Sequence, residues 1–140
     1  MRFTALLALG MALLSPQRSF ATTAYDIDFK LNNSLSYDSI DISVDYSAAN
    51  GDFTGSGDTV ACTANASLSA LAAFNEASPV LKAGIGRSTP IAGPVVLFTC
   101  TFDSNGGAPS AGNFVITLRG WESTSTSTAP TIQISRIQVH

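Results

Sequence analysis

The sequence has few of the residues that carry chemistry. Its 140 residues include one histidine, two cysteines and one tryptophan, and only 12% of them are charged. The histidine is His140, the last residue, so a Ser-His-Asp or Cys-His catalytic set would depend on that one side chain. Neither a Gly-x-Ser-x-Gly elbow nor a phosphate-binding loop occurs. The sequence therefore predicts a protein that is not an enzyme and that needs no cofactor.

Basic residues are scarce as well. The chain has 7 lysines and arginines against 10 acidic residues, and Lys30 and Lys82 are its only lysines. Proteins that bind nucleic acids need a stripe of basic side chains for the phosphates, and no such stripe is present. This argues against a nucleic acid as partner.

Long hydrophobic runs are absent except for one at the N-terminus. Residues 3–14 are uncharged, mostly apolar and follow Arg2, which is typical of a signal peptide, whereas a membrane-spanning helix needs about 20 residues. Ser19 and Ala21 place small residues for cleavage after residue 21, and Ala24 offers a second position. We expect a signal peptide over 1–21 and one domain over 22–140 with a net charge of −5, secreted to an extracellular or periplasmic location. An uncleaved N-terminal anchor is the alternative interpretation.

What the sequence does contain is a series of short apolar–polar alternations, which indicate half-buried strands. The expected strands are 25–31, 40–46, 59–63, 80–87, 95–102, 113–119 and 131–139. Residues 65–76 have some helical character and are expected to form a turn or two of helix or a packed loop, and 90–94 a connector. Turn residues every 8–12 positions and the lack of a βαβ pattern predict an all-β, antiparallel β-sandwich of about seven to nine strands.

Three strands have features of their own. The apolar parity changes at Asp38–Ser39 and again at Ser135–Arg136, so each position is expected to hold a β-bulge, or a loop at the first. The stretch 95–102 is apolar at successive positions, which predicts an interior strand covered on both faces.

The two cysteines lie in two of these expected strands. Cys62 and Cys100 would meet the oxidising environment of an exported protein, so we predict a disulfide between them. A bridge across this separation stabilises the fold by about 4 kcal/mol in the loop-entropy model.

The order of these pieces resembles a known family. The segments 39–47, 51–57, 60–62, 81–85, 93–102 and 111–118 together resemble bacterial cohesin-like domains, over roughly residues 25–139. The resemblance implies a jelly-roll sandwich similar to carbohydrate-binding modules. It also implies a role in adhesion and assembly without catalysis.

Candidate binding residues are few. Sugar rings stack on exposed aromatic rings, which makes Trp121 and Tyr37 the tentative ligand-binding residues, although for Trp121 a ring that closes the bottom of the core is the favoured alternative. Asp52 and Asp58 flank a glycine-rich turn and Asp103 opens an Asp-Ser-Asn-Gly turn, so these three are weak candidates for a structural calcium ion. A pair of carboxylates could in principle serve a glycosidase, but most acidic residues lie at solvated positions.

The sequence therefore predicts a secreted, non-enzymatic binding or adhesion module for a protein or a polysaccharide. The alternative is a structural subunit of a surface fibre or matrix, joined through sheet edges. A small hydrolase is the third and least favoured class.

Overall fold

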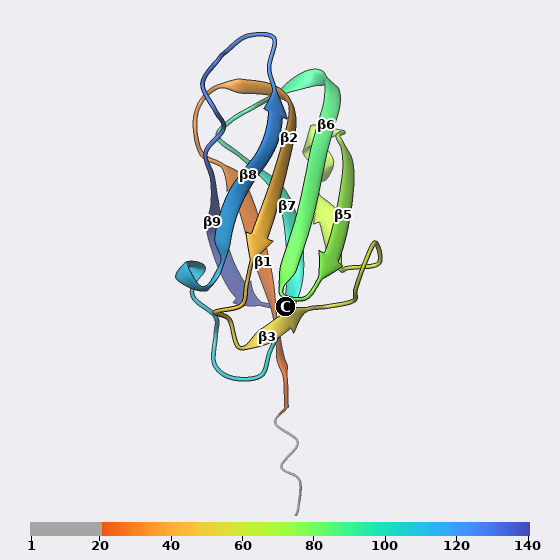
Figure 1. The fold of residues 1–140 in the computed structure, drawn as a ribbon, viewed down its shortest axis with the longest axis vertical. Coiled ribbons are helices and arrows are strands. Elements are labelled where there is room, and N and C mark those ends of the chain that lie inside the picture. The colour runs from red at the N-terminus through yellow and green to blue at the C-terminus, as the bar shows by residue number, and fades with distance from the viewer. Residues whose placement is uncertain (1–20) are drawn as a thin grey trace, which may run out of the picture.

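Alternating apolar residues give each long strand one face that must be buried, and two antiparallel sheets bury these faces against each other (Figure 1). The computed structural model describes residues 21–140. Within them lie the strands β1 (Thr23–Leu31), β2 (Ser36–Asp45), β3 (Gly51–Phe53), β4 (Cys62–Ala64), β5 (Leu71–Ala77), β6 (Val80–Ala92), β7 (Val95–Ser104), β8 (Val115–Glu122) and β9 (Ile132–Val139). Two short 3-10 turns complete the described part, η1 (Ala66–Leu68) and η2 (Ala111–Asn113). The all-β sandwich expected from the sequence is confirmed.

The strand order sets which strands are edges. The five-stranded sheet runs β9-β1-β7, and both β3 and β4 pair with the far side of β7. The four-stranded sheet runs β5-β6-β2-β8 and lies in front in Figure 1. Its edges are therefore β5 and β8, while the other sheet ends in β9 on one side and in β3 and β4 on the other.

The core between the sheets is rich in aromatic and β-branched residues. At its centre Phe29 and Phe98 stack at 4.6 Å between ring centroids. Towards one end Tyr46, Phe53 and Phe102 form edge-to-face contacts between 5.0 and 6.0 Å. Such pairs add about 1 kcal/mol each beyond their buried area.

The predicted disulfide is present. Cys62 on β4 and Cys100 on β7 lie directly opposite each other and are bonded, with 38 residues of sequence separation. Cys100 is fully buried in the core. The bridge therefore attaches a strand of only three residues to the interior of the five-stranded sheet.

Both expected bulges are confirmed. The register between β2 and β6 shifts between Tyr37 and Ser39. The register between β1 and β9 shifts opposite Ser135, which has no partner on β1. Each shift restores the inward direction of the apolar residues that follow it.

The prediction that β7 is covered on both faces is wrong, although the strand is interior. Its register with β1 skips Leu97, so Leu97 and Phe98 are both buried at a bulge and produce the apolar run. Beyond the bulge the outward positions carry Thr99 and Thr101, whose hydroxyls donate to aspartates on β1.

Three element assignments from the sequence also differ. Of the expected stretch 65–76, only Ala66–Leu68 form a helical turn, η1, whereas Leu71–Ala77 form β5 because the tight turn at Ser78-Pro79 folds them back onto β6. The strand β6 continues to Ala92 through the expected connector, and Pro90 is tolerated there because residues 87–90 have no partner on β2. The strand expected at 59–63 is shorter and begins later, as β4 at Cys62–Ala64.

The sequence also predicts a signal peptide and no membrane-spanning segment in the domain that follows it. The predicted signal peptide lies outside the described residues, apart from Ala21, and stays a prediction. Across residues 21–140 no helix is long and apolar enough to span a bilayer.

Candidate functional site

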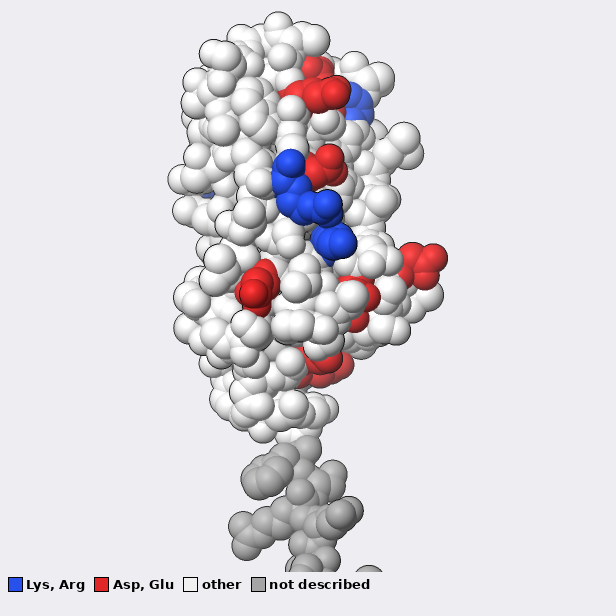
Figure 2. Space-filling model, viewed as in Figure 1, with Lys and Arg blue, Asp and Glu red and all other residues white. Residues whose placement is uncertain are grey.

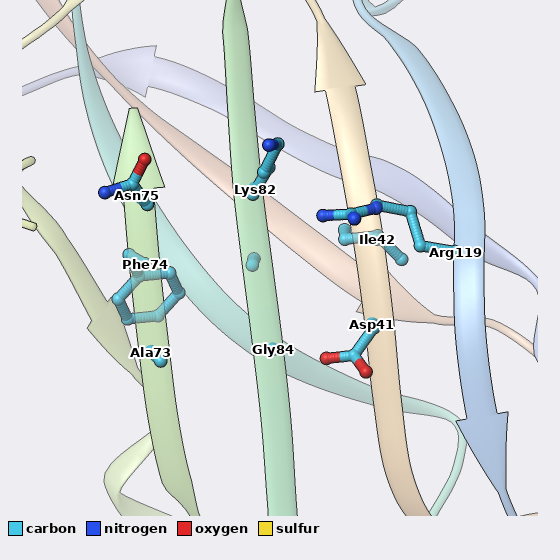
Figure 3. A pocket seen from close by; sticks show the side chains of 9 residues that line it. Asp41, Ile42, Ala73, Phe74, Asn75, Lys82, Gly84 and Arg119 are labelled. Atoms are coloured by element: carbon cyan, nitrogen blue, oxygen red, sulfur yellow. The ribbon is translucent and has the colours of Figure 1, made fainter. Parts of the chain in front are cut away.

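A groove runs along β6 on the outer face of the four-stranded sheet. One hollow of about 390 Å³ lies above Gly84 and Ala73, and charged and amide side chains border it, namely Asp41, Asn75, Lys82 and Arg119 (Figure 3). A second hollow of about 320 Å³ shares Asp41, Ala73 and Gly84 with it and continues over Ser39, Leu71 and Gly86. Because the two hollows share these residues, we treat them as one site, called here the Gly84 groove.

The floor of the groove follows from the alternation of β6. Leu81, Ala83 and Ile85 point into the core, so Gly84 and Gly86 take the outward positions and leave them empty. A glycine inside a strand weakens it and often marks a place where another group approaches the backbone closely.

Asp41 lies between two glycines. It is opposite Gly84 on β6 and opposite Gly120 on β8. A Cβ atom placed on Gly84 would lie only 2.6 Å from Asp41 Oδ1, and one on Gly120 would lie 3.7 Å from Oδ2. The carboxylate therefore occupies the space that the missing side chains leave, and no neighbouring side chain on either strand covers it.

Arg119 reaches the groove because of a bulge in β8. The register pairs Asp41 with Gly120 and Ile42 with Leu118, which leaves Arg119 as the extra residue. In a bulge two successive residues turn toward the same side of the sheet. Arg119 thus shares the outer face with Gly120, and its guanidinium lies above Ile42 and toward Lys82 in Figure 3.

The charges of the groove form no salt bridge with any other residue that the structure describes. Among residues 21–140 the salt bridges are Arg136 to Asp28 and His140 to Asp26, so Asp41, Lys82 and Arg119 are in none. All three are exposed. In Figure 2 basic groups gather near the centre of this face with an acidic group beside them, and further acidic groups lie toward both ends of the face. The groove therefore offers cationic donors and an anionic acceptor to a ligand.

The aromatic residues proposed for sugar binding lie elsewhere. The ring of Tyr37 is fully buried, and its hydroxyl accepts from Asn33 Nδ2 at 2.6 Å and donates to the carbonyl of Thr128 at 3.1 Å. Trp121 is half-buried and meets Tyr37 edge-to-face at 5.8 Å. The structure thus brings the two rings together, but Tyr37 has no face exposed to a ligand.

The three acidic residues considered for calcium do not form one cluster. Asp52 on β3 is paired in register with Asp103 on β7, and Asp103 accepts from Thr54 Oγ1 at 2.7 Å. Asp58 lies in the loop that follows β3. Within residues 21–140 no group of three or more histidine, cysteine or acidic side chains is placed to hold a metal ion.

A buried polar contact that the sequence did not indicate surrounds Tyr46. Its hydroxyl contacts the carboxylates of both Asp52 and Glu76, from β3 and β5. Burial and these two hydrogen bonds raise the pKa of Tyr46. Tyr46 is 1% exposed and Glu76 is 6% exposed, so Glu76 is closed to a substrate, whereas Asp52 is exposed. The contact between Tyr46 and Asp52 connects the two sheets.

The outer face of the five-stranded sheet holds a second set of charges. Arg136 donates to Asp28 through Nε at 2.6 Å and Nη2 at 3.1 Å, and Thr99 Oγ1 donates to the same carboxylate at 2.7 Å. Burial acts to raise the pKa of Asp28, but the hydrogen bonds from Arg136 and Thr99 outweigh it and hold that pKa below its usual value.

The groove could have been noticed in the sequence. The alternation Lys82-x-Gly84-x-Gly86 places two glycines on the same face of the expected strand 80–87, which is where a strand leaves room for another group to approach its backbone. The bulge at Arg119 could not be recognised in the sequence. Gly120 has no side chain, so the change in the alternation of apolar and polar residues does not show there. No protein-family model, no curated protein and no solved structure matches this chain.

Proposed function

We propose that this protein is an exported, non-catalytic binding module that holds a polypeptide segment of another protein in the Gly84 groove. The observation that carries the proposal is the groove itself, a glycine-floored depression with charges of both signs that no other part of the described chain neutralises. Unpaired charges around an open strand surface are the kind of group that a partner's side chains and backbone can satisfy.

The composition of the groove favours a polypeptide over a polysaccharide. A sugar-binding cleft needs a flat aromatic ring at its surface, and Phe74 is the only aromatic residue among the described residues that line the groove. Phe74 is half-buried and packs against Phe98 at 5.2 Å between ring centroids, so its ring is engaged with the core. The exposed Leu71 and the methyl group of Ala73 add apolar contacts at one rim.

The cationic side chains indicate the chemistry of the partner. Lys82 and Arg119 lie on the same side of the groove, and Arg119 can bind a carboxylate with two parallel hydrogen bonds. Asp41 and Asn75 provide acceptors for backbone N–H groups and hydroxyls. A segment with an acidic side chain near the middle therefore fits the groove best.

The proposal is tested by selecting peptides on the purified, disulfide-bonded chain from a displayed random library, with a glycan array in parallel. The affinities of the selected peptides are then measured by calorimetry for wild type, Gly84→Val, Arg119→Ala and Thr117→Val. Gly84→Val fills the groove, whereas Thr117 lies on the same face outside it and provides the matched control. Circular dichroism confirms that each variant is folded.

We expect acidic peptides whose affinity falls about tenfold or more in Gly84→Val and in Arg119→Ala but not in Thr117→Val. A library that returns no peptide dependent on these two residues would overturn the polypeptide partner. Sugar binding that is lost in Gly84→Val would assign the groove to a polysaccharide instead.

A further inference from the structure

The four edges of the two sheets are not equally protected against pairing with another strand. Natural edge strands are kept short, or carry a bulge or an outward charge, because their unpaired backbone groups invite other strands. The strands β3 and β4 have three residues each. The strand β9 contains the bulge at Ser135 and the charge of Arg136, and β8 contains the bulged Arg119.

The remaining edge, β5, has none of these protections. Its seven residues pair with β6 in an unbroken register from Leu71 to Ala77. It contains no proline and no lysine, and its one charged residue, Glu76, points inward and is buried. Leu71 at its start is 84% exposed, the most exposed of the large hydrophobic residues that the structure describes.

The contact between Glu76 and Gly57 shows which backbone groups of β5 point away from β6. Glu76 exchanges two backbone hydrogen bonds with Gly57, at 2.8 and 2.9 Å, on the side away from β6. Backbone groups alternate in direction along a strand, so the N–H and C=O groups of Phe74 and Ala72 point to that same open side. They form a short row of donors and acceptors, and no strand within residues 21–140 pairs with it.

We propose that β5 pairs with β5 of a second copy of this chain, in antiparallel register about a two-fold axis at Ala73. This register places Ala72 opposite Phe74 of the second copy, and by symmetry Phe74 opposite its Ala72. Both residues of each pair have outward backbone groups, so the two pairs form four hydrogen bonds. The joined sheets make one continuous sheet of eight strands from the two four-stranded sheets.

A second copy suits this edge better than an unrelated strand because the edge is self-complementary. The residue on the axis is alanine, which lets the two backbones approach without a clash. The molecule has a net charge of −5 over residues 22–140, yet β5 brings no exposed charge to the axis. Gly57 occupies the position beyond Asn75, so pairing is confined to residues 71–75 and the dimer is a modest, reversible one.

The dimer has a consequence for the surface of the molecule. The Gly84 groove reaches the edge of the sheet at Leu71 and Ala73. Across the two-fold axis the groove of the second copy begins at the same residues, so the two grooves join into one longer surface on a single face. The pairing itself does not depend on what the groove binds.

The test is the oligomeric state of the purified, disulfide-bonded chain by sedimentation velocity across a wide concentration range. We expect the mass to rise to twice that of one chain with concentration. Ala73→Lys puts two like charges opposite each other on the axis and should abolish this rise, whereas Thr117→Lys adds the same charge to the same face at β8 and should leave it unchanged.

A second variant tests the register directly. Ala73→Cys places two thiols at a non-hydrogen-bonded pair with Cα atoms about 4.5 Å apart, a separation at which an intermolecular disulfide can form on mild oxidation. Thr117→Cys is the control and should remain monomeric in non-reducing electrophoresis. A strict monomer at every concentration, or cross-linking that is no faster for Ala73→Cys than for Thr117→Cys, would overturn the proposal.

Discussion

The two outer faces of the sandwich use charged side chains in opposite ways. On the five-stranded sheet Asp28 is held by Arg136 and by Thr99, and His140 Nδ1 lies 2.8 Å from Asp26 Oδ1. On the four-stranded sheet the corresponding central strand, β2, carries Asp41, which lies beside two glycines and forms no salt bridge within residues 21–140. The charges of Asp28 and Arg136 join strands of the first face, whereas Asp41, Lys82 and Arg119 on the second face are exposed and form no salt bridge within residues 21–140.

This difference separates a face that stabilises the fold from a face that can bind. Paired and hydrogen-bonded carboxylates resist displacement, because a new ligand would have to replace contacts already made. An exposed charge over a glycine has no such contacts to give up. Variants on the five-stranded side should therefore change stability without changing binding, and variants in the groove should do the reverse.

The largest expected effect concerns the disulfide of the five-stranded sheet. The double variant Cys62→Ala with Cys100→Ala should lower the free energy of unfolding by about 4 kcal/mol, because the closed loop spans 38 positions. Urea unfolding followed by fluorescence measures the change, with the reduced wild type as a matched control. The affinity for a groove-binding peptide should be unchanged while the variant is folded. A loss under about 1 kcal/mol would contradict the stabilising role.

A smaller effect is expected at the contact between the sheets. Tyr46→Phe leaves the buried carboxylate of Glu76 without its hydroxyl partner and should cost about 2 kcal/mol. Because the pKa of Tyr46 is raised in the folded state, the wild type should lose stability as the pH rises above the ordinary value of 10.0. Thermal unfolding between pH 7 and 11 measures this loss of stability. The loss at alkaline pH should be larger in wild type than in Tyr46→Phe, which lacks the titrating hydroxyl.

Much of the difference between the two outer faces could not be predicted from the sequence. The strand pattern, the bulges at Asp38 and Ser135 and the bridge from Cys62 to Cys100 could be predicted, since each depends on local alternation or on the compartment. The pairing of strands could not. Whether an outward aspartate meets an arginine, as Asp28 does, or a glycine, as Asp41 does, depends on which strand lies beside it.

The candidate site was missed for the same reason. The aromatic rings of Trp121 and Tyr37 were the candidates that the sequence offered, but Tyr37 lies just before a bulge and its ring points into the core. The groove is instead defined by missing side chains on β6 and by a bulge on β8. These lie 35 residues apart between Gly84 and Arg119, and only the register of β2 brings them together.

The ion pair of the five-stranded sheet should show a moderate effect with a defined pH dependence. Asp28→Asn removes the charge from the contact with Arg136 and should lower stability by about 1 kcal/mol at pH 7. The lowered pKa of Asp28 means that its contribution is present above the ordinary value of 3.8 and is lost as the pH falls through the folded-state value. The variant should therefore have a shallower loss of stability below pH 4 than wild type. Parallel acid titrations that coincide for the two proteins would refute this assignment.

The smallest effect has the opposite sign and belongs to the groove. Gly84→Ala should raise the free energy of unfolding by about 0.5 kcal/mol, because glycine weakens a strand relative to alanine and the group in its way is the end of the Asp41 side chain. Gly86→Ala is the matched control, since a Cβ there meets only ordinary contacts at 3.5 Å or more. Urea unfolding of both variants compares them. Destabilisation by Gly84→Ala alone would show that Asp41 is held in place, and the two faces would then no longer differ in the way their charges are used.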